Sequence, residues 1–435
     1  MTSSTHHLFR ADGETAFTMN AQAMKFGPGV VAELGDDAKS LGMTRAALFI
    51  DPNVAGTEPA RIARASLAQA GIDAAVYQAI RIEPTDTSFL DAAKFASEGN
   101  FDGIISLGGG STIDTAKAAN LLATYPDDLL AYINAPIGGA KPVPGPLLPH
   151  IACPTTSGTG SETTGVAICD LVDLKVKTGV SSKLMRPTMA VVDPTTTEIM
   201  PAGVVACTGF DVFTHAIESY TARPYTSREK PASSALRPPY QGANPFSDIG
   251  AMHAIRLAGR YLMRGVADEE DTEARHALMF ASTLAGVAFG NAGVHIPHAM
   301  SYAVASQNHT YLANGYETEG GMVPHGLSVV INAPAAFRFT ADAQPERHLE
   351  AAAALGADVS GAAPEDAGEI LAQRLETMMR QTNLPSGLEQ IGYRDNDVPA
   401  LVEGAYAQQR LLVMAPKDVS KDDLADLFRA AMRYW

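Results

Sequence analysis

The sequence is poor in cysteine and in positive charge, and each shortage excludes a class of protein. Three cysteines among 435 residues are too few for a disulfide framework, which favours a reducing compartment. Lys and Arg number 32 against 48 Asp and Glu, so the formal net charge is −16. Nucleic-acid phosphates require clustered basic side chains. We therefore expect no nucleic-acid partner.

Segments that would place the chain in a membrane or a secretory route are also lacking. The best candidate for a span, residues 277–297, contains Ser282, Asn291 and His295, which favours a buried helix. The first residues lack the apolar centre of a secretory signal, and Asp12 and Glu14 argue against a transit peptide. We expect a cytoplasmic protein without membrane contact, or a mitochondrial matrix protein if the source is eukaryotic.

The pattern of apolar residues changes near residue 197. Before it, predicted strands (46–50, 74–77, 103–107) alternate with predicted helices (60–70, 87–98, 111–124), which is typical of a helix-covered parallel sheet. After it, helical patterns dominate (202–222, 247–265, 270–290, 344–355, 364–382, 423–433). The sequence predicts an α/β domain over 1–197 and an all-α domain over 198–435. The Pro- and Ser-rich segment 222–246 is an excursion, a lid or an oligomer contact.

A run of glycines joins the third predicted strand to the third predicted helix. Gly108, Gly109, Gly110 and Ser111 let the backbone approach a ligand, and the helix N-terminus suits a pyrophosphate. The spacing matches neither common phosphate-binding fingerprint, so a plain tight turn is the alternative. The polar loop 154–162 follows the next predicted strand, and its hydroxyls suit phosphate or ribose contacts.

Aspartate and histidine gather in three segments of the helical half. Asp211 and His215 are four residues apart, His295 and His298 are three apart, and His325 follows later. On a helix, such spacings place side chains on one face, where they can share an ion. Taken singly, each histidine is more often a structural residue than a ligand. Three imidazoles and one carboxylate suit Fe²⁺ or Zn²⁺, whereas Ca²⁺ prefers oxygen ligands.

Five motifs, taken in this order, resemble the iron-containing (group III) alcohol dehydrogenase family. They are GGGSTIDTAK (108–117), PTTSGTGSE (154–162), GFDVFTHAIESY (209–220), FGNAGVHIPHAM (289–300) and VPHGLSVV (323–330). The resemblance covers nearly the whole chain. It implies a Rossmann-like dinucleotide-binding domain followed by an all-helical metal-binding domain, which is the dehydroquinate synthase-like or iron alcohol dehydrogenase fold. It also implies a homo-oligomer, a dimer or larger.

The family pattern, carried over residue by residue, implies a set of site residues. The metal ligands are Asp211, His215, His298 and His325, with Fe²⁺ favoured and Zn²⁺ as the alternative. The cofactor is NAD rather than NADP, because an acidic residue at the position of Asp51 repels a 2′-phosphate. The cofactor-binding residues are Asp51, Gly108, Gly109, Gly110, Ser111, Asp114, Thr155, Thr156, Thr159 and Lys177.

Two features of the sequence depart from the commoner family pattern. Many members carry a proton-relay histidine four residues beyond the first late ligand, where this chain has Tyr302. We therefore consider both Tyr302 and His295 as catalytic residues. The insert between His298 and His325 is longer than in the simplest members, and segment 222–246 is extra.

These departures resemble one branch of the family. Its members move a hydride from a hydroxyacid of the 4-hydroxybutyrate type to an oxoacid of the 2-oxoglutarate type. Anionic substrates need a local cation in a chain of net charge −16, and Arg237 is the candidate. One alternative is an NAD-dependent alcohol dehydrogenase for small alcohols or aldehydes. Another is a non-catalytic nucleotide-binding protein on the same fold.

Overall fold

The chain forms two compact units in the computed structural model, which describes residues 5–11, 13–308, 310–316 and 321–435. The sheet unit comprises Ala21–Met200 and Glu269–Thr283. The helical unit comprises Pro201–Asp268, Leu284–Trp435 and the described part of Met1–Asn20. The units therefore do not follow the single cut at residue 197 that the sequence predicts.

Hydrogen bonds between residues far apart in the sequence explain why two segments belong to units from which they are distant along the chain. Glu14 accepts a hydrogen bond from Nε of Arg237 at 2.8 Å, which ties the N-terminal segment to the helical unit. Arg275 is buried and donates to the carbonyls of Thr197 and Met200 at 3.1 and 2.9 Å. This pairing places residues 269–283 in the sheet unit. Patterns within a short window cannot reveal such pairs.

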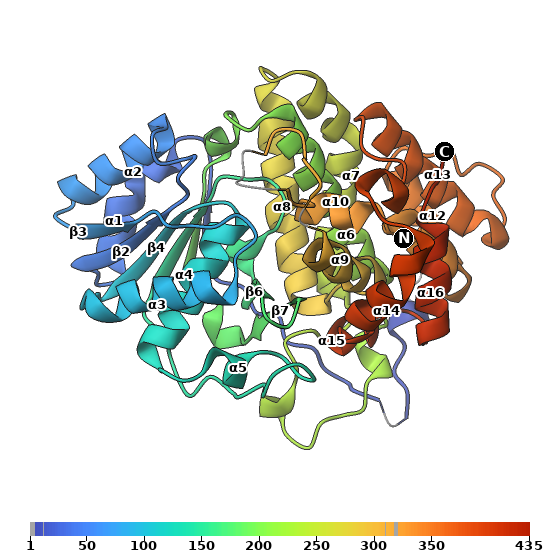
Figure 1. Ribbon diagram of the computed structural model, residues 1–435, viewed down its shortest axis with the longest axis horizontal. Helices are drawn as coiled ribbons and strands as arrows, with labels where there is room; N and C mark the ends of the chain where they lie inside the picture. The colour runs from blue at the N-terminus through green and yellow to red at the C-terminus, as the bar shows by residue number, and fades with distance from the viewer. Residues whose placement is uncertain (1–4, 12, 309, 317–320) are drawn as a thin grey trace. The chain divides into compact units, whose positions relative to one another are not determined.

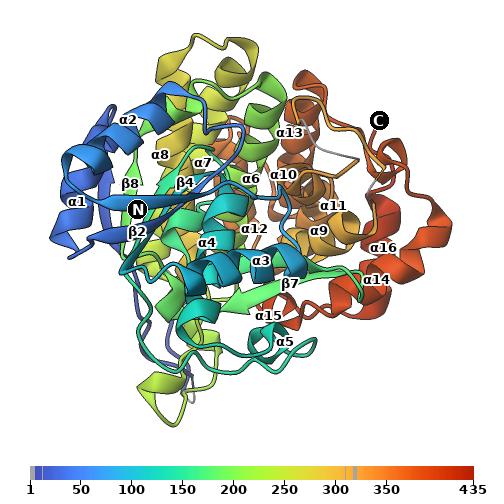
Figure 2. The same cartoon turned by 60° about the vertical axis from the view of Figure 1, so that its left-hand side comes forward.

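A six-stranded sheet forms the centre of the sheet unit, in the order β1-β8-β5-β4-β2-β3 with every pair parallel. Helices α1 to α4 lie against it (Figures 1 and 2). Its strands are β1 (Ala23–Phe26), β2 (Arg45–Ile50), β3 (Asp73–Tyr77), β4 (Gly103–Gly108), β5 (His150–Pro154) and β8 (Met189–Val192). The helices are α1 (Leu34–Ser40), α2 (Glu58–Gln69), α3 (Asp86–Glu98), α4 (Gly110–Thr124) and the short α5 (Leu129–Tyr132).

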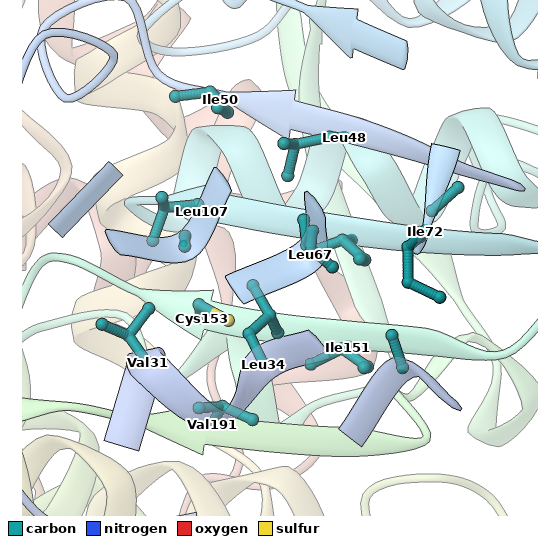
Figure 3. Packing of buried hydrophobic residues seen from close by; sticks show 14 of the residues in the cluster. Val31, Leu34, Leu48, Ile50, Leu67, Ile72, Leu107, Ile151, Cys153 and Val191 are labelled. Carbon is teal, nitrogen blue, oxygen red and sulfur yellow. The ribbon is translucent and has the colours of Figure 1, made fainter. Parts of the chain in front are cut away.

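Strand β2 is buried on both faces, as a central parallel strand must be when helices cover both sides. Leu48 and Ile50 pack with residues of α1 and α2, including Leu34 and Leu67 (Figure 3). Phe49 points the other way, into a second cluster with residues of α3 and α4. Because both faces are apolar, the strand is a continuous apolar run, which is why its position could be predicted from sequence.

The short apolar run VAICD (166–170), which is typical of a strand, does not join this sheet. It forms β6 (Val166–Leu171), which pairs with β7 (Val176–Ser181) in a separate antiparallel hairpin and makes one isolated bridge, from Asp170 to Thr85. The hairpin packs on α4 through a buried cluster that includes Leu121, Ala167 and Val180. A short apolar run predicts a strand but not its partner, so the sequence could not place this one.

The helical unit is built from α6 to α16, and α8 contributes residues to both units. The helices are α6 (Ala202–Thr221), α7 (Pro245–Ala267), α8 (Thr272–Ala292), α9 (Ile296–Gln307), α10 (His325–Val330), α11 (Ala333–Thr340), α12 (Pro345–Ala354), α13 (Ala367–Gln381), α14 (Val398–Tyr406), α15 (Gln409–Leu412) and α16 (Lys421–Ala430). The predicted fold class, an α/β part followed by a helical part, is confirmed.

Segment 222–246 contains only two short 3-10 turns, Tyr225–Ser227 and Ser234–Leu236, before α7 begins. Backbone hydrogen bonds tie its ends to the rest of the helical unit: the N–H of Arg223 donates to Met414 at 2.9 Å, and that of Gln241 donates to Asn291 at 2.8 Å.

Within the described residues, no single helix is long and apolar enough to cross a membrane. Helices α8 and α9 pass that test of length and composition only as a pair, and they meet at a bend of 103°.

Lys117 is an unexpected buried cation at the centre of the sheet unit. Its Nζ donates to the carbonyls of Ser161 and Val166 at 2.7 and 2.9 Å and lies 3.5 Å from the carboxylate of Asp114. Burial lowers its pKa to about 8. The i, i+3 pair with Asp114 is thus part of a buried network that holds the hairpin to α4, rather than a surface ion pair.

We predict that Lys117→Met destabilises the protein by about 3–5 kcal/mol, because the buried acceptors around Nζ lose their donor. Urea unfolding followed by circular dichroism measures the change. Lys94→Met, at an exposed position of α3, is the matched control and should be nearly neutral. Equal stability of the two variants would contradict this role.

Candidate metal centre and nucleotide-binding turn

Three helices of the helical unit carry the predicted metal ligands. Asp211 and His215 lie one turn apart on α6, His298 lies in the first turn of α9, and His325 begins α10. Asp211, His215 and His298 are buried, and the side chain of His325 is 24% exposed. The cluster is therefore accessible to solvent at His325.

Gly293 makes the sharp turn that brings α9 back toward α6. Its φ of +97° lies in the region that L side chains rarely adopt. A Cβ there would lie 3.0 Å from Met414 and 3.1 Å from Tyr240. Pro297 follows at the start of α9, where its missing N–H costs nothing. Gly293 and Pro297 therefore fix where α9 begins and, with it, the position of His298.

Gly326 brings α10 onto α6. A Cβ at this position would lie 1.9 Å from the carbonyl oxygen of Cys207 and 3.1 Å from Cβ of Asp211. Only glycine allows so close an approach of the two backbones. The contact places His325, the preceding residue, beside Asp211.

One ligand atom from each of the four residues lies within 4.8 Å of the others. Oδ1 of Asp211 is 3.5 Å from Nδ1 of His215, 3.5 Å from Nε2 of His298 and 3.8 Å from Nε2 of His325. Ligands about 2.1 Å from a tetrahedral ion are separated by about 3.4 Å. The spacing therefore fits one small divalent cation.

The hydrogen bonding of the cluster also fits a cation. Oδ1 of Asp211, Nδ1 of His215 and Nε2 of His298 are buried and have no hydrogen-bond partner among the described residues. Such atoms are costly when nothing satisfies them. Burial lowers the pKa of His215 to about 3, which keeps its imidazole in the neutral form that binds metals. That these four residues bind a metal stays a prediction.

Glu218, which the sequence reasoning missed, holds His298 in place. Its fully buried carboxylate contacts Nδ1 of His298 and accepts a hydrogen bond from the N–H of His295 at 2.7 Å. A carboxylate on one ring nitrogen fixes the tautomer and leaves the other nitrogen for the metal. The signal was present in the spacing, since Glu218 follows Asp211 by seven residues and His215 by three.

His295 does not face the ligand cluster. Its side chain is fully buried, Nε2 lies 3.0 Å from Oγ1 of Thr221, and Nδ1 lies 3.9 Å from Glu218. Burial lowers its pKa to about 4. These contacts give no support to its predicted role as a proton relay, which stays a prediction. The ring of Tyr302, by contrast, lies 6.3 Å from that of His325.

Arg237 is not the free cation that the sequence predicts. It donates to both carboxylate oxygens of Glu14, at 2.8 and 3.1 Å, and Glu14 is fully buried. The hydrogen bonds from Arg237 lower the pKa of Glu14 to about 2. This guanidinium neutralises a buried acid within the helical unit, so the prediction that it binds a substrate carboxylate is not supported.

The predicted cofactor residues lie at the carboxyl edge of the sheet. The glycine turn follows β4, the polar loop follows the adjacent β5, and Asp51 follows β2 on the other side of β4. The chain runs outward from β2 to β3 and returns to β4, so Asp51 and the glycine turn flank the switch point of the sheet. Open α/β sheets bind their ligands at this point.

The glycine turn and the polar loop are packed so closely that side chains on the glycines would clash. A Cβ on Gly110 would lie 2.6 Å from Thr159, and one on Gly109 would lie 3.1 Å from Thr156. No described side chain caps the N-terminus of α4. The turn thus offers open backbone N–H groups at a helix N-terminus, which fits a pyrophosphate. Thr155 is buried, and its N–H donates to Gly108 at 3.0 Å.

Three other predicted cofactor residues have partners within the protein. Oγ of Ser111 accepts from the N–H of Glu83 at 3.2 Å, and Asp114 accepts from the N–H of Ile168 at 2.9 Å. Lys177 is buried between Glu83 and Asp170, at 2.8 and 3.0 Å. Burial works to lower the pKa of Lys177, but these two carboxylates raise it above its usual value. The contacts of Asp114 and Lys177 are structural ones.

We predict that Glu218→Gln weakens metal binding about 10–100-fold, because the amide loses the charge that orients His298. Chelator competition followed by elemental analysis measures the affinity. Glu346→Gln, at an exposed position of α12, is the control and should bind metal like the natural protein. Loss of metal from Glu218→Gln and from the control at the same chelator concentration would refute the assignment.

We predict that Arg237→Gln lowers Tm at pH 7 without changing KM for a hydroxyacid. The depressed pKa of Glu14 contributes stability that is complete above 4.5 and lost as the pH falls toward about 2. The Tm difference between variant and natural protein should therefore shrink over this range. Scanning calorimetry from pH 7 to pH 3 measures it, and an equal Tm at pH 7 would contradict the pairing.

Comparison with known proteins gives a consistent result. Residues 21–194 match the family described as iron-containing alcohol dehydrogenase, and residues 240–432 match the C-terminal part of the Fe-containing alcohol dehydrogenase family. The chain is 49% identical over 422 residues to the Bos taurus protein named hydroxyacid-oxoacid transhydrogenase, mitochondrial, covering 97% of this chain and 91% of that protein. The Homo sapiens protein of the same name is 48% identical, with coverage of 97% and 90%.

Solved structures agree with the fold. A 1,3-propanediol oxidoreductase superposes with a TM-score of 0.83 at 28% identity, covering 96% of this chain and 100% of that chain. An alcohol dehydrogenase from Oenococcus oeni gives 0.82 at 28% identity, with the same coverage. The family implies NAD(H) and a divalent metal, and a non-catalytic role is set aside. This chain belongs to the iron-containing alcohol dehydrogenase family and is an oxidoreductase.

Proposed function

We propose that this chain moves a hydride from a hydroxyacid of the 4-hydroxybutyrate type to an oxoacid of the 2-oxoglutarate type. The observation that carries the proposal is the identity of 49% over 97% of the chain with a relative named for this reaction. The reaction balances without an external oxidant. The hydroxyacid loses one hydride and one proton and becomes an aldehyde, and the oxoacid gains both and becomes a hydroxyacid.

Asp211, His215, His298 and His325 would hold the divalent metal, with Fe²⁺ favoured because of the family and Zn²⁺ as the alternative. Such a bound ion lowers the pKa of a substrate hydroxyl and favours its alkoxide. With one carboxylate among the ligands, the site keeps about one net positive charge. Glu218 holds the ring of His298 in register. His325 lies on the solvent-accessible side, where water can take the hydroxyl proton.

The backbone of residues 108–111 would hold the pyrophosphate of NAD, with Thr155, Thr156 and Thr159 completing the cradle. Held there, NAD would supply the group that carries the hydride from the first substrate to the second. Asp51 accepts a hydrogen bond from the N–H of Asn53 at 2.8 Å, which fixes the carboxylate near the switch point. A carboxylate there hydrogen-bonds ribose hydroxyls and repels a 2′-phosphate, which favours NAD over NADP.

The alternative is an NAD-dependent alcohol dehydrogenase for small alcohols, favoured by the likeness to 1,3-propanediol oxidoreductase.

We expect a homo-oligomer in either case. We expect a cytoplasmic location, or the mitochondrial matrix if the source is eukaryotic; the names of the relatives support only the second of these.

We predict that the purified protein, given 4-hydroxybutyrate and 2-oxoglutarate without added NAD, forms 4-oxobutyrate and 2-hydroxyglutarate in equal amounts. Cofactor retained on the protein would carry the hydride between the substrates. Mass spectrometry of the products over many turnovers measures this, and elemental analysis of the same sample separates iron from zinc. A strict requirement for added NAD would instead support the alcohol dehydrogenase.

A further inference from the structure

Arg410 presents an uncompensated positive charge inside the helical unit. Nη2 donates to the hydroxyl of Tyr302 at 3.2 Å, and the guanidinium carbon lies 5.7 Å from the ring centre of Tyr240. Its Nε and Nη1 atoms are buried and have no hydrogen-bond partner among the described residues. Within that part of the chain, no carboxylate lies within 4.0 Å of Arg410. These two nitrogens therefore have hydrogen-bonding capacity that the described residues do not use.

Two other arginines of the helical unit, by contrast, are paired with acids. Arg338 pairs with Glu369 at 2.6 Å, and Arg347 pairs with Asp248 at 2.7 Å. A buried charge without a counter-charge is expensive, and the two tyrosine rings beside Arg410 offset only part of that cost. A bound anion supplies the counter-charge that is missing in such an environment. The planar fork of a guanidinium matches a carboxylate in particular.

Tyr302 links this guanidinium to the ligand cluster. It follows His298 by four residues, so both side chains lie on one face of α9. Its ring centre is 6.3 Å from the ring of His325 and 6.0 Å from the guanidinium carbon of Arg410. Arg410 therefore lies on the same side of α9 as the candidate metal site, one aromatic ring away from it.

We propose that Arg410 binds the carboxylate of the substrate, with the hydroxyl of Tyr302 positioning the guanidinium. The assignment rests on the proposed function for the identity of the substrates. In 4-hydroxybutyrate, two methylenes separate the hydroxyl-bearing carbon from the carboxylate carbon. Two methylenes also separate the keto carbon of 2-oxoglutarate from its distal carboxylate carbon. One cation at one distance from the reacting carbon therefore serves both substrates.

The net charge of the chain gives this cation a further role. A charge of −16 repels anionic substrates at long range, so their capture requires a local attraction. Arg410 provides it near the candidate metal site, whereas Arg237 is neutralised by Glu14.

The test is Arg410→Met, with Arg429→Met at an exposed position of α16 as the control. We expect kcat/KM for 4-hydroxybutyrate to fall about 100-fold, while kcat/KM for the uncharged 1,4-butanediol changes less than about threefold. Added NAD is supplied so that the assay does not depend on retained cofactor. Calorimetry should show a similar weakening of 2-oxoglutarate binding. Equal losses for both substrates, or no loss for either, would overturn the proposal.

Arg410→Lys keeps the positive charge but loses the planar pair of donors that a guanidinium offers to a carboxylate. It is the second test variant, for use if Arg410→Met does not fold. It should raise KM for 4-hydroxybutyrate at least about tenfold with little change in kcat, and an unchanged KM would overturn the proposal. The proposed function can fail separately. If the natural protein needs added NAD for every turnover but Arg410 variants still discriminate against carboxylates, the assignment of Arg410 stands alone.

Discussion

Oδ1 of Asp211, Nδ1 of His215 and Nε2 of His298 meet in a buried space where no described hydrogen-bond donor or acceptor satisfies them. A folded protein tolerates such atoms when a ligand completes them, and a divalent cation is the ligand that we propose here. Three nearby residues bring these atoms together. Gly293 turns α9, Gly326 admits α10 against α6, and the carboxylate of Glu218 sets the ring of His298.

The glycine turn of the sheet unit suits a different ligand, because its backbone can approach an anion closely. A Cβ on Gly109 would lie against Thr156 and one on Gly110 against Thr159, so the turn has no room for side chains at these two positions. Nζ of Lys117 donates hydrogen bonds to the carbonyl oxygens of Ser161, in the loop after β5, and of Val166, in the hairpin. These bonds hold both segments to α4. A buried polar network of this kind rigidifies a turn whose glycines would otherwise leave it loose.

Much of this was visible in the sequence because the signals are local. A helix places residues four apart on one face, so Asp211 and His215 could be paired from spacing alone. Continuous apolar runs mark buried parallel strands, and glycines between a strand and a helix mark the turn. Glu218 carries the same helical spacing but was missed, because a carboxylate that supports a ligand leaves no signature different from a surface glutamate.

The sequence by itself determined the family, the order of strands and helices, and the four candidate ligands, since each depends on residues close together in the chain. Only the tertiary structure decided which charges are free. Arg237 pairs with Glu14 and Lys177 with Glu83, whereas Arg410 has no described acid beside it. Charge pairing acts through space between residues far apart in sequence, and folding alone determines which of them meet.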